Sequence, residues 1–153
     1  MDKMVIVTGA SRGIGASIAR DLAEAGSTVD CLPRSGSLPA VEDVPDAVRA
    51  RCIPVASDVA DEQSFRAGIM KLAEQGHAVV GLVNNAGLHV EAPSANLPVA
   101  EWDMLMAANA TSVVIGCQAA FPHLKAAGGG LIVNIGSFFD KLGVRRNLAY
   151  CAS

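Results

Sequence analysis

Three side chains in the second half of the sequence carry groups that can form hydrogen bonds or exchange a proton. Ser137 follows a short apolar run, and Tyr150 comes 13 residues later. Asn109 interrupts a long apolar stretch, although asparagine is a mediocre helix former because its amide competes for backbone hydrogen bonds. A hydroxyl and a phenol that reach one oxygen could hold it and exchange a proton with it. These residue types indicate acid–base chemistry if the fold brings them together.

A glycine-rich segment near the N-terminus could bind a phosphate. It runs from Thr8 to Gly15, directly after the apolar run Met4–Thr8, with glycines at positions 9, 13 and 15. Glycines let the backbone turn tightly and approach a pyrophosphate, and a helix N-terminus offers free N–H groups and a positive dipole end. An ordinary strand–helix turn without a ligand is the alternative, but the position between a strand and a helix favours a phosphate site.

The elements that must position these residues alternate between strand and helix patterns. Expected strands are Met4–Thr8, Thr28–Leu32, Arg51–Ala56, Val79–Val83 and Leu131–Ile135. Expected helices are Ile14–Ala25, a segment capped by Asp61 that runs to about Glu74, and Val99–Ala126. Such alternation predicts an α/β fold with a parallel sheet covered on both faces and ligands at the carboxyl ends of the strands.

Several local features refine this expectation. Apolar residues at positions 14, 18, 22 and 25 have helical spacing and predict the buried face of the first helix. Pro33–Pro45 is rich in Pro, Ser and Gly, which predicts a loop with a short helix after it. Pro122 should kink the last long helix or end its regular part early, because proline lacks a backbone N–H.

The motifs and their order resemble the short-chain dehydrogenase/reductase family. That family carries Thr-Gly-x-x-x-Gly-x-Gly early and Tyr-x-x-x-Lys later, and Asn84-Asn85-Ala86-Gly87 is similar to another of its signatures. The resemblance covers essentially the whole chain. It implies one dinucleotide-binding domain over residues 1–153, with a Rossmann-like doubly wound parallel sheet truncated after the fifth strand.

The resemblance also implies roles for individual residues. Ser137 would hydrogen-bond the substrate carbonyl oxygen, and Tyr150 would donate a proton to it as hydride arrives from the nicotinamide, or remove it in the other direction. Asn109 would distort its helix and hold a water in the proton relay. Asp58 would hold the adenine amino group, and the amide of Val59 would touch the ring. The cofactor-binding residues that the resemblance implies are Gly9, Ser11, Arg12, Gly13, Ile14, Gly15, Arg34, Asp58, Val59, Asn85, Ala86 and Gly87.

The choice between NADP(H) and NAD(H) depends on the end of the second expected strand. In the family's pattern the position that selects NAD falls on Pro33, and Arg34 follows it. Arg12 and Arg34 would suit a 2′-phosphate through charge-assisted hydrogen bonds, which favours NADP(H). Asp30 is the competing ribose ligand and would favour NAD(H), although it falls inside the strand.

The family's lysine is expected one residue beyond Ser153. In the family this lysine lowers the pKa of the tyrosine and holds the nicotinamide ribose. We therefore expect little or no turnover from these 153 residues alone, and a non-catalytic NAD(P)-binding module is the alternative function. An NADP(H)-dependent reductase or dehydrogenase of ketones and alcohols is the first hypothesis.

Composition and spacing bear on whether the protein binds nucleic acid, a membrane or a metal. A formal net charge of −3 argues against a nucleic-acid surface. The sequence predicts no membrane helix, because no apolar run reaches the roughly 18–20 residues that one needs. The three histidines lack metal-ligand spacing, and a cytoplasmic location is expected. His89 could line the substrate mouth or be an ordinary loop histidine. The family forms dimers or tetramers, so a homo-oligomer is expected, whereas the substrate cannot be read from the sequence.

Overall fold

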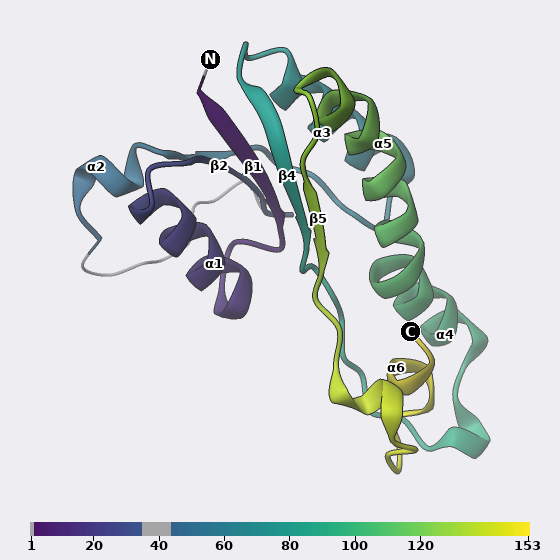
Figure 1. The fold of residues 1–153 in the computed structure, drawn as a ribbon. Coiled ribbons are helices and arrows are strands. Elements are labelled where there is room, and N and C mark those ends of the chain that lie inside the picture. The colour runs from purple at the N-terminus through teal and green to yellow at the C-terminus, as the bar shows by residue number, and fades with distance from the viewer. Residues whose placement is uncertain (1, 35–43) are drawn as a thin grey trace.

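Five parallel strands form one sheet in a computed structural model that describes residues 2–34 and 44–153 (Figure 1). The strands are β1 (Lys3–Thr8), β2 (Thr28–Leu32), β3 (Cys52–Pro54), β4 (Ala78–Asn84) and β5 (Leu131–Asn134). Their order is β3-β2-β1-β4-β5. This order matches that of a doubly wound dinucleotide-binding fold, so the predicted fold class is confirmed.

Helices cover both faces of the sheet. They are α1 (Gly13–Glu24), α2 (Asp46–Arg49), α3 (Glu62–Ala73), α4 (Val99–Met106), α5 (Ser112–Ala126) and α6 (Leu148–Ala152). The 3₁₀ turns η1 (Ser94–Asn96) and η3 (Phe138–Lys141) and the π-helical turn η2 (Ala107–Thr111) complete the elements. Figure 1 shows α1 on one face of the sheet and α3 and α5 on the other. Most of the predicted loop Pro33–Pro45 lies outside the described residues, and α2 is the short helix expected after it.

The buried face of α1 is not the one predicted. Gly15, Ala19 and Ala23 are the buried residues of this helix, whereas Ile14 is 63% exposed. Small residues at i, i+4 and i+8 let the helix axis approach the sheet closely, and the larger Ile18 and Leu22 pack beside this line of contact. Ile14 is thereby left free to face the end of the sheet rather than its core.

The larger core lies between the sheet and the helices α3 and α5. Met4 and Ile6 of β1 and Phe65 of α3 are fully buried there. Full burial of an apolar side chain as large as these stabilises the fold by about 1.5–3 kcal/mol.

The predicted cap of α3 is confirmed, because the Asp61 carboxylate accepts a hydrogen bond of 2.6 Å from the Ser64 N–H.

One charged residue lies in this core. Asp30, in the middle of β2, is 0% exposed, and both its carboxylate oxygens lack a hydrogen-bond partner among the described residues. Because side chains alternate along a strand, Asp30 shares the face of Leu32, which packs toward α3. Desolvation raises the pKa of the Asp30 carboxyl to about 7. An unpartnered carboxylate in an apolar core is a stability liability whose size depends on pH.

Two element predictions need correction. The third strand was expected to span Arg51–Ala56, but β3 is only Cys52–Pro54, at the sheet edge where a proline without an N–H is tolerated. The long helix was expected to change at Pro122, but α5 continues to Ala126. Its regular geometry instead gives way at η2, around Asn109. A proline near a helix end removes one hydrogen bond, and the surrounding packing holds the helix in place.

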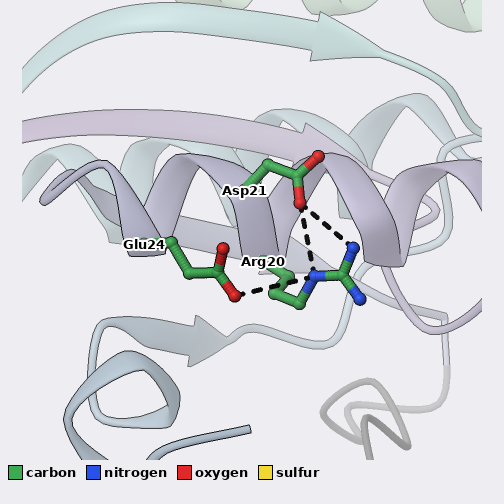
Figure 2. Close-up of polar contacts among 3 residues, drawn as sticks. All are labelled: Arg20, Asp21 and Glu24. Carbon is green, nitrogen blue, oxygen red and sulfur yellow. Dashed lines mark hydrogen bonds and ion pairs between the residues drawn. The ribbon is translucent and has the colours of Figure 1, made fainter.

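The surface of α1 carries a small ionic cluster. Arg20 lies beside Asp21 at 3.2 Å and Glu24 at 3.8 Å, as Figure 2 shows. All three side chains are exposed, so each pair contributes at most about 0.5 kcal/mol to helix stability. The cluster lies away from the carboxyl ends of the strands, where ligands bind in this fold class.

The combined helical stretch Val99–Ala126 differs from the expectation that no apolar segment is long enough for a membrane helix. By length and composition alone it could cross a membrane, with a mean hydropathy of 1.4 over its most apolar window. One third of that window is buried in the fold. Ile115, Ala120 and Leu124 of α5 belong to the core against the sheet, which accounts for part of the apolar character of this helix.

Candidate active site

The three residues predicted to be catalytic all line one cavity of about 450 Å³. Ser137, Tyr150 and Asn109 all line it, as do Ile14 and the segment Asn85–Gly87. They come from the segments that follow β1, β4 and β5 and from η2 and α6. The complete lining is Ile14, Asn85, Ala86, Gly87, Leu88, His89, Asn109, Ile135, Gly136, Ser137, Asp140, Tyr150 and Ser153.

The glycine-rich turn has the geometry of a phosphate cradle. Gly9 and Gly13 have positive φ values of 65° and 58°, a conformation that side chains rarely adopt. A Cβ added to Gly15 would lie 2.5 Å from the Gly9 carbonyl oxygen, so the turn closes too tightly for any side chain there. A Cβ on Gly13 would meet nothing within 4 Å, which leaves open space beside the start of α1.

The N-terminus of α1 is suited to an anion. Arg12 occupies the N-cap position but makes no side-chain capping hydrogen bond, in contrast to Asp61 of α3. The first N–H groups of a helix have no intrahelical partner, and they carry the positive end of the helix dipole. Together with the open space at Gly13, these donors fit the pyrophosphate of a dinucleotide.

Asn85 ties the glycine turn to the end of β4. Its side-chain amide donates to the Thr8 carbonyl oxygen at 3.0 Å and contacts the Gly9 carbonyl oxygen at 3.4 Å. The Thr8 hydroxyl oxygen accepts hydrogen bonds from the backbone N–H groups of Asn85 and Ala86, both at 3.0 Å. The two cofactor motifs that lie far apart in sequence therefore form one rigid unit.

Asn109 sits in η2, where the helix departs from regular α geometry, as the resemblance implied. Its Oδ1 accepts from the Leu88 N–H at 2.7 Å, and its Nδ2 donates to the Leu88 carbonyl oxygen at 2.9 Å. The same Nδ2 donates to the Ser153 hydroxyl at 2.9 Å. The side chain of Asn109 thus makes three hydrogen bonds to protein groups at the cavity wall.

Ser137 and Tyr150 present hydroxyls to the cavity from two different segments. The Ser137 Oγ accepts a hydrogen bond from the Phe139 N–H at 3.3 Å, so its own O–H is free to donate. Tyr150 lies in α6, and its hydroxyl makes no hydrogen bond within the described residues. Its ring packs edge to face against His89 and Phe139, with centroid separations of 4.6 and 5.7 Å.

Three polar residues of the cavity were not predicted as site residues. Ser153 lies three residues after Tyr150, and this i, i+3 helical spacing was the signal available in the sequence. Asp140 follows Ser137 by three residues in η3 and pairs with Lys141 at 2.8 Å. For His89 the sequence allowed a residue at the substrate mouth or an ordinary loop histidine, and the residue lies on the cavity wall.

Other predicted cofactor residues lie outside this cavity, toward the opposite end of the glycine turn. Arg34 is exposed just after β2, whose last residue accepts a hydrogen bond from the Gly9 N–H at 3.2 Å. Ser11 and Arg12 lie in the turn before α1. Asp58 uses one carboxylate oxygen to accept from the Ala60 N–H at 3.0 Å, and Val59 packs against the core.

The position of Asp30 bears on the choice of cofactor. Its carboxylate is fully buried within the sheet, so it cannot contact a ribose bound at the carboxyl edge. The competing interpretation of Asp30 as a ribose ligand is therefore wrong. Among residues 2–34 and 44–153, no group of three or more His, Cys, Asp or Glu side chains is arranged as metal ligands.

Comparisons with known proteins agree with this geometry. The family model described as short chain dehydrogenase matches residues 3–153. The 2-(R)-hydroxypropyl-CoM dehydrogenase of Xanthobacter autotrophicus is 35% identical, over 100% of this chain and 63% of that protein. The 3-oxoacyl-[acyl-carrier-protein] reductase of Staphylococcus aureus is 33% identical, over 100% of this chain and 63% of that protein.

A solved structure is also similar. The crystal structure of a metagenomic short-chain oxidoreductase in complex with NADP matches with a TM-score of 0.84 and 31% identity. The match covers 98% of this chain and 69% of that one. The present chain spans 63% of the length of the two named relatives.

Proposed function

Because the chain belongs to the short-chain dehydrogenase/reductase family, we propose that it reduces a ketone, or oxidises the corresponding alcohol, with NADP(H). The observation that carries this proposal is the convergence of Ser137, Tyr150 and Asn109 on one cavity that also includes Ile14 and Asn85–Gly87. Residues suited to acid–base chemistry and residues suited to cofactor binding thereby share one space at the carboxyl ends of the strands.

The residues around the glycine turn would hold the dinucleotide. The N–H groups at the start of α1 would bind the pyrophosphate, while Asn85, Ala86 and Gly87 would form the floor beside the nicotinamide half. When bound, the nicotinamide supplies a hydride to the carbonyl carbon of a ketone, or accepts one from an alcohol. Asp58 and Val59 would contact the adenine, since they follow β3 at the same edge of the sheet.

Ser137 and Tyr150 would act on the substrate oxygen. The Ser137 hydroxyl donates a hydrogen bond to that oxygen and orients it. Tyr150 transfers its phenolic proton to the oxygen as the alcohol forms, and takes the proton back in the oxidative direction. The rings of His89 and Phe139 hold the Tyr150 ring by edge contacts, so its hydroxyl keeps one direction. Asn109 holds the cavity wall through Leu88 and Ser153.

NADP(H) is the cofactor that this chain's arginines favour. Arg12 and Arg34 flank the turn where the adenosine ribose would lie, and both are exposed. A guanidinium can bind a 2′-phosphate by two parallel hydrogen bonds. The exclusion of Asp30 from this edge removes the acidic group that would favour NAD(H).

Assembly and location are part of the same proposal. Val99 and Met104 of α4 and Val114 and Phe121 of α5 are exposed apolar side chains, and such residues favour burial against a second copy. We expect a cytoplasmic homo-oligomer, a dimer or a tetramer, which acts on small carbonyl or alcohol substrates.

The test is carbonyl-dependent oxidation of NADPH over a panel of ketones, with a protein that carries the family's lysine after Ser153. We expect turnover that Tyr150→Phe abolishes, while NADPH binding measured by fluorescence titration persists. Retained turnover in Tyr150→Phe would contradict the assigned role of this residue. Binding of NADPH without turnover of any carbonyl would instead support the non-catalytic binding module.

A further inference from the structure

His89 occupies a distinctive place on the wall of the cavity. It lies in the segment after β4, is exposed, and contacts the rings of both Tyr150 and Phe139. His89 and Tyr150 line the same cavity, so a substrate held against the Tyr150 hydroxyl also lies near His89. The substituent attached to the reacting carbonyl carbon is therefore the part of the substrate within reach of His89.

The proton on the His89 ring can be assigned from its partner. One ring nitrogen, Nε2, is hydrogen-bonded to the Asn147 Oδ1. The Asn147 Nδ2 donates to the Arg145 carbonyl oxygen at 2.9 Å, which fixes the orientation of the amide and makes its Oδ1 an acceptor. Nε2 must then carry the hydrogen, and in the neutral ring Nδ1 carries a lone pair.

The loop around Asn147 is held in place. Asn147 is buried, and the Ala92 N–H donates to the Arg146 carbonyl oxygen at 2.9 Å. Arg146 has a positive φ of 65°, which is uncommon for a residue other than glycine. These contacts join the segment after β4 to the segment before α6, so His89 is fixed in position relative to Tyr150.

A second side chain of the cavity can accept a hydrogen bond. Asp140 also lines the cavity, and a carboxylate is an acceptor. The lining residues thus include two acceptors, the His89 Nδ1 and the Asp140 carboxylate, and no lysine or arginine. Lys141, which pairs with Asp140 at 2.8 Å, is not among them. This combination suits a neutral substrate that brings its own donor and disfavours an anionic one.

From this arrangement we propose that His89 is a specificity-determining residue whose Nδ1 accepts a hydrogen bond from a hydroxyl adjacent to the reacting carbon. The preferred substrates are then hydroxyketones, and vicinal diols in the oxidative direction. This inference rests on the proposed function and names the substrate class for the same site.

The experiment compares two ketones that differ by one hydroxyl, 3-hydroxybutan-2-one and butan-2-one. For each, kcat/KM for NADPH-dependent reduction is measured with the whole protein. We expect a ratio in favour of the hydroxyketone of about tenfold or more, since one hydrogen bond separates the two substrates. His89→Phe keeps a ring against Tyr150 but removes the acceptor, so it should bring the ratio close to one.

Two further variants serve as a partial rescue and as a control. His89→Asn places an acceptor near the position of Nδ1 and should restore part of the preference. His123→Phe changes a histidine of α5 that does not line the cavity, and it should leave the ratio as it is. A ratio near one in the unmodified protein, or an unchanged ratio in His89→Phe, would overturn the inference while ketone reduction itself stands.

A binding measurement separates failure of this inference from failure of the proposed function. The ¹⁵N resonance of the His89 Nδ1 is followed while each ketone is added to the protein saturated with NADP⁺. We expect a shift with 3-hydroxybutan-2-one and none with butan-2-one. That shift without any turnover would contradict the proposed chemistry and support the role of His89, whereas its absence would overturn the role of His89.

Discussion

Asn109 and Leu88 are joined by a reciprocal pair of hydrogen bonds between a side-chain amide and a backbone peptide. The Asn109 Oδ1 accepts from the Leu88 N–H at 2.7 Å, and its Nδ2 donates to the Leu88 carbonyl oxygen at 2.9 Å. The segment after β4 is not part of the sheet at this point, so its peptide groups would otherwise need water. Asn109 therefore fixes the wall that carries Leu88 and His89.

Removal of this amide should destabilise the protein and the cavity together. We expect Asn109→Ala to lower the free energy of unfolding by about 1–3 kcal/mol, because it leaves two partly buried backbone groups unpaired. Asn109→Asp should be at least as harmful, since a carboxylate cannot donate to the Leu88 carbonyl oxygen. Denaturant unfolding measures both, and Asn96→Ala, an exposed asparagine of η1, is the control. Equal stability of Asn109→Asp and the unmodified protein would contradict the bonding scheme.

The glycine turn should not tolerate a side chain at position 15. A Cβ there would lie 2.5 Å from the Gly9 carbonyl oxygen and would also collide with the Asn85 amide. We expect Gly15→Ala to weaken NADPH binding by at least about tenfold, since the turn and the start of α1 must move apart. Gly143→Ala is the control, because a Cβ on Gly143 meets nothing within 4 Å. Fluorescence titration with NADPH compares the two, and equal affinities would rule out the cradle described here.

Much of the positioning frame could be predicted from the sequence. The glycines between an apolar strand and a helix, and the Asn-Asn-Ala-Gly segment after another strand, are local patterns with local causes. Their mutual contact through Asn85 and Thr8 follows once parallel strands place their carboxyl ends at one edge. The Asp61 cap is similarly local and was predicted correctly.

The features that the sequence did not reveal depend on tertiary packing. Helical spacing alone favoured Ile14 for the core, but close approach to the sheet selects Gly15 and Ala19 instead. The contact between His89 and Asn147 joins residues far apart in the chain, and no periodic pattern in the sequence predicts it. At Pro122 a local pattern predicted a kink or helix end, but tertiary packing of α5 overrides the tendency of proline to break a helix.

Arg34 should contribute to the preference for NADPH over NADH. A charge-assisted hydrogen bond to the 2′-phosphate contributes about 1.5–3 kcal/mol, which corresponds to a factor of roughly 10–100 in affinity. We expect Arg34→Ala to weaken NADPH binding by this factor and to change NADH binding little. Lys71→Ala, on the exposed surface of α3, controls for the loss of net charge. If the dissociation constants for NADPH and NADH rise in parallel, or both stay unchanged, Arg34 does not contact the 2′-phosphate.

The buried carboxyl of Asp30 should make stability depend on pH. Desolvation raises its pKa to about 7 in the folded protein, against about 3.9 in an unfolded chain. The folded state then binds the proton more tightly, so stability is greatest at low pH and falls as pH rises from about 4 to about 7. The full difference amounts to about 4 kcal/mol, on the order of 1.4 kcal/mol for each pH unit in that window.

Substitution of Asp30 should remove this dependence. We expect Asp30→Val, which preserves approximate size and suits a strand, to unfold at higher denaturant concentration than the unmodified protein at pH 8. Its unfolding free energy should vary less between pH 4 and pH 7. Asp21→Asn, an exposed carboxylate of α1, serves as the control and should retain the slope. A pH slope in Asp30→Val as steep as in the unmodified protein would show that other groups cause it.

The reaction proposed for this cavity is hydride transfer from a bound nicotinamide to a carbonyl carbon, with Tyr150 as the proton donor. The most direct measurement uses NADPH deuterated at both C4 positions, a panel of ketones that includes 3-hydroxybutan-2-one, and mass analysis of the alcohols formed. We expect one deuterium on the carbinol carbon with the unmodified protein, and none above background with a Tyr150→Phe variant that still binds NADPH. Alcohol formed without deuterium, or equal deuterium transfer by Tyr150→Phe, would contradict it.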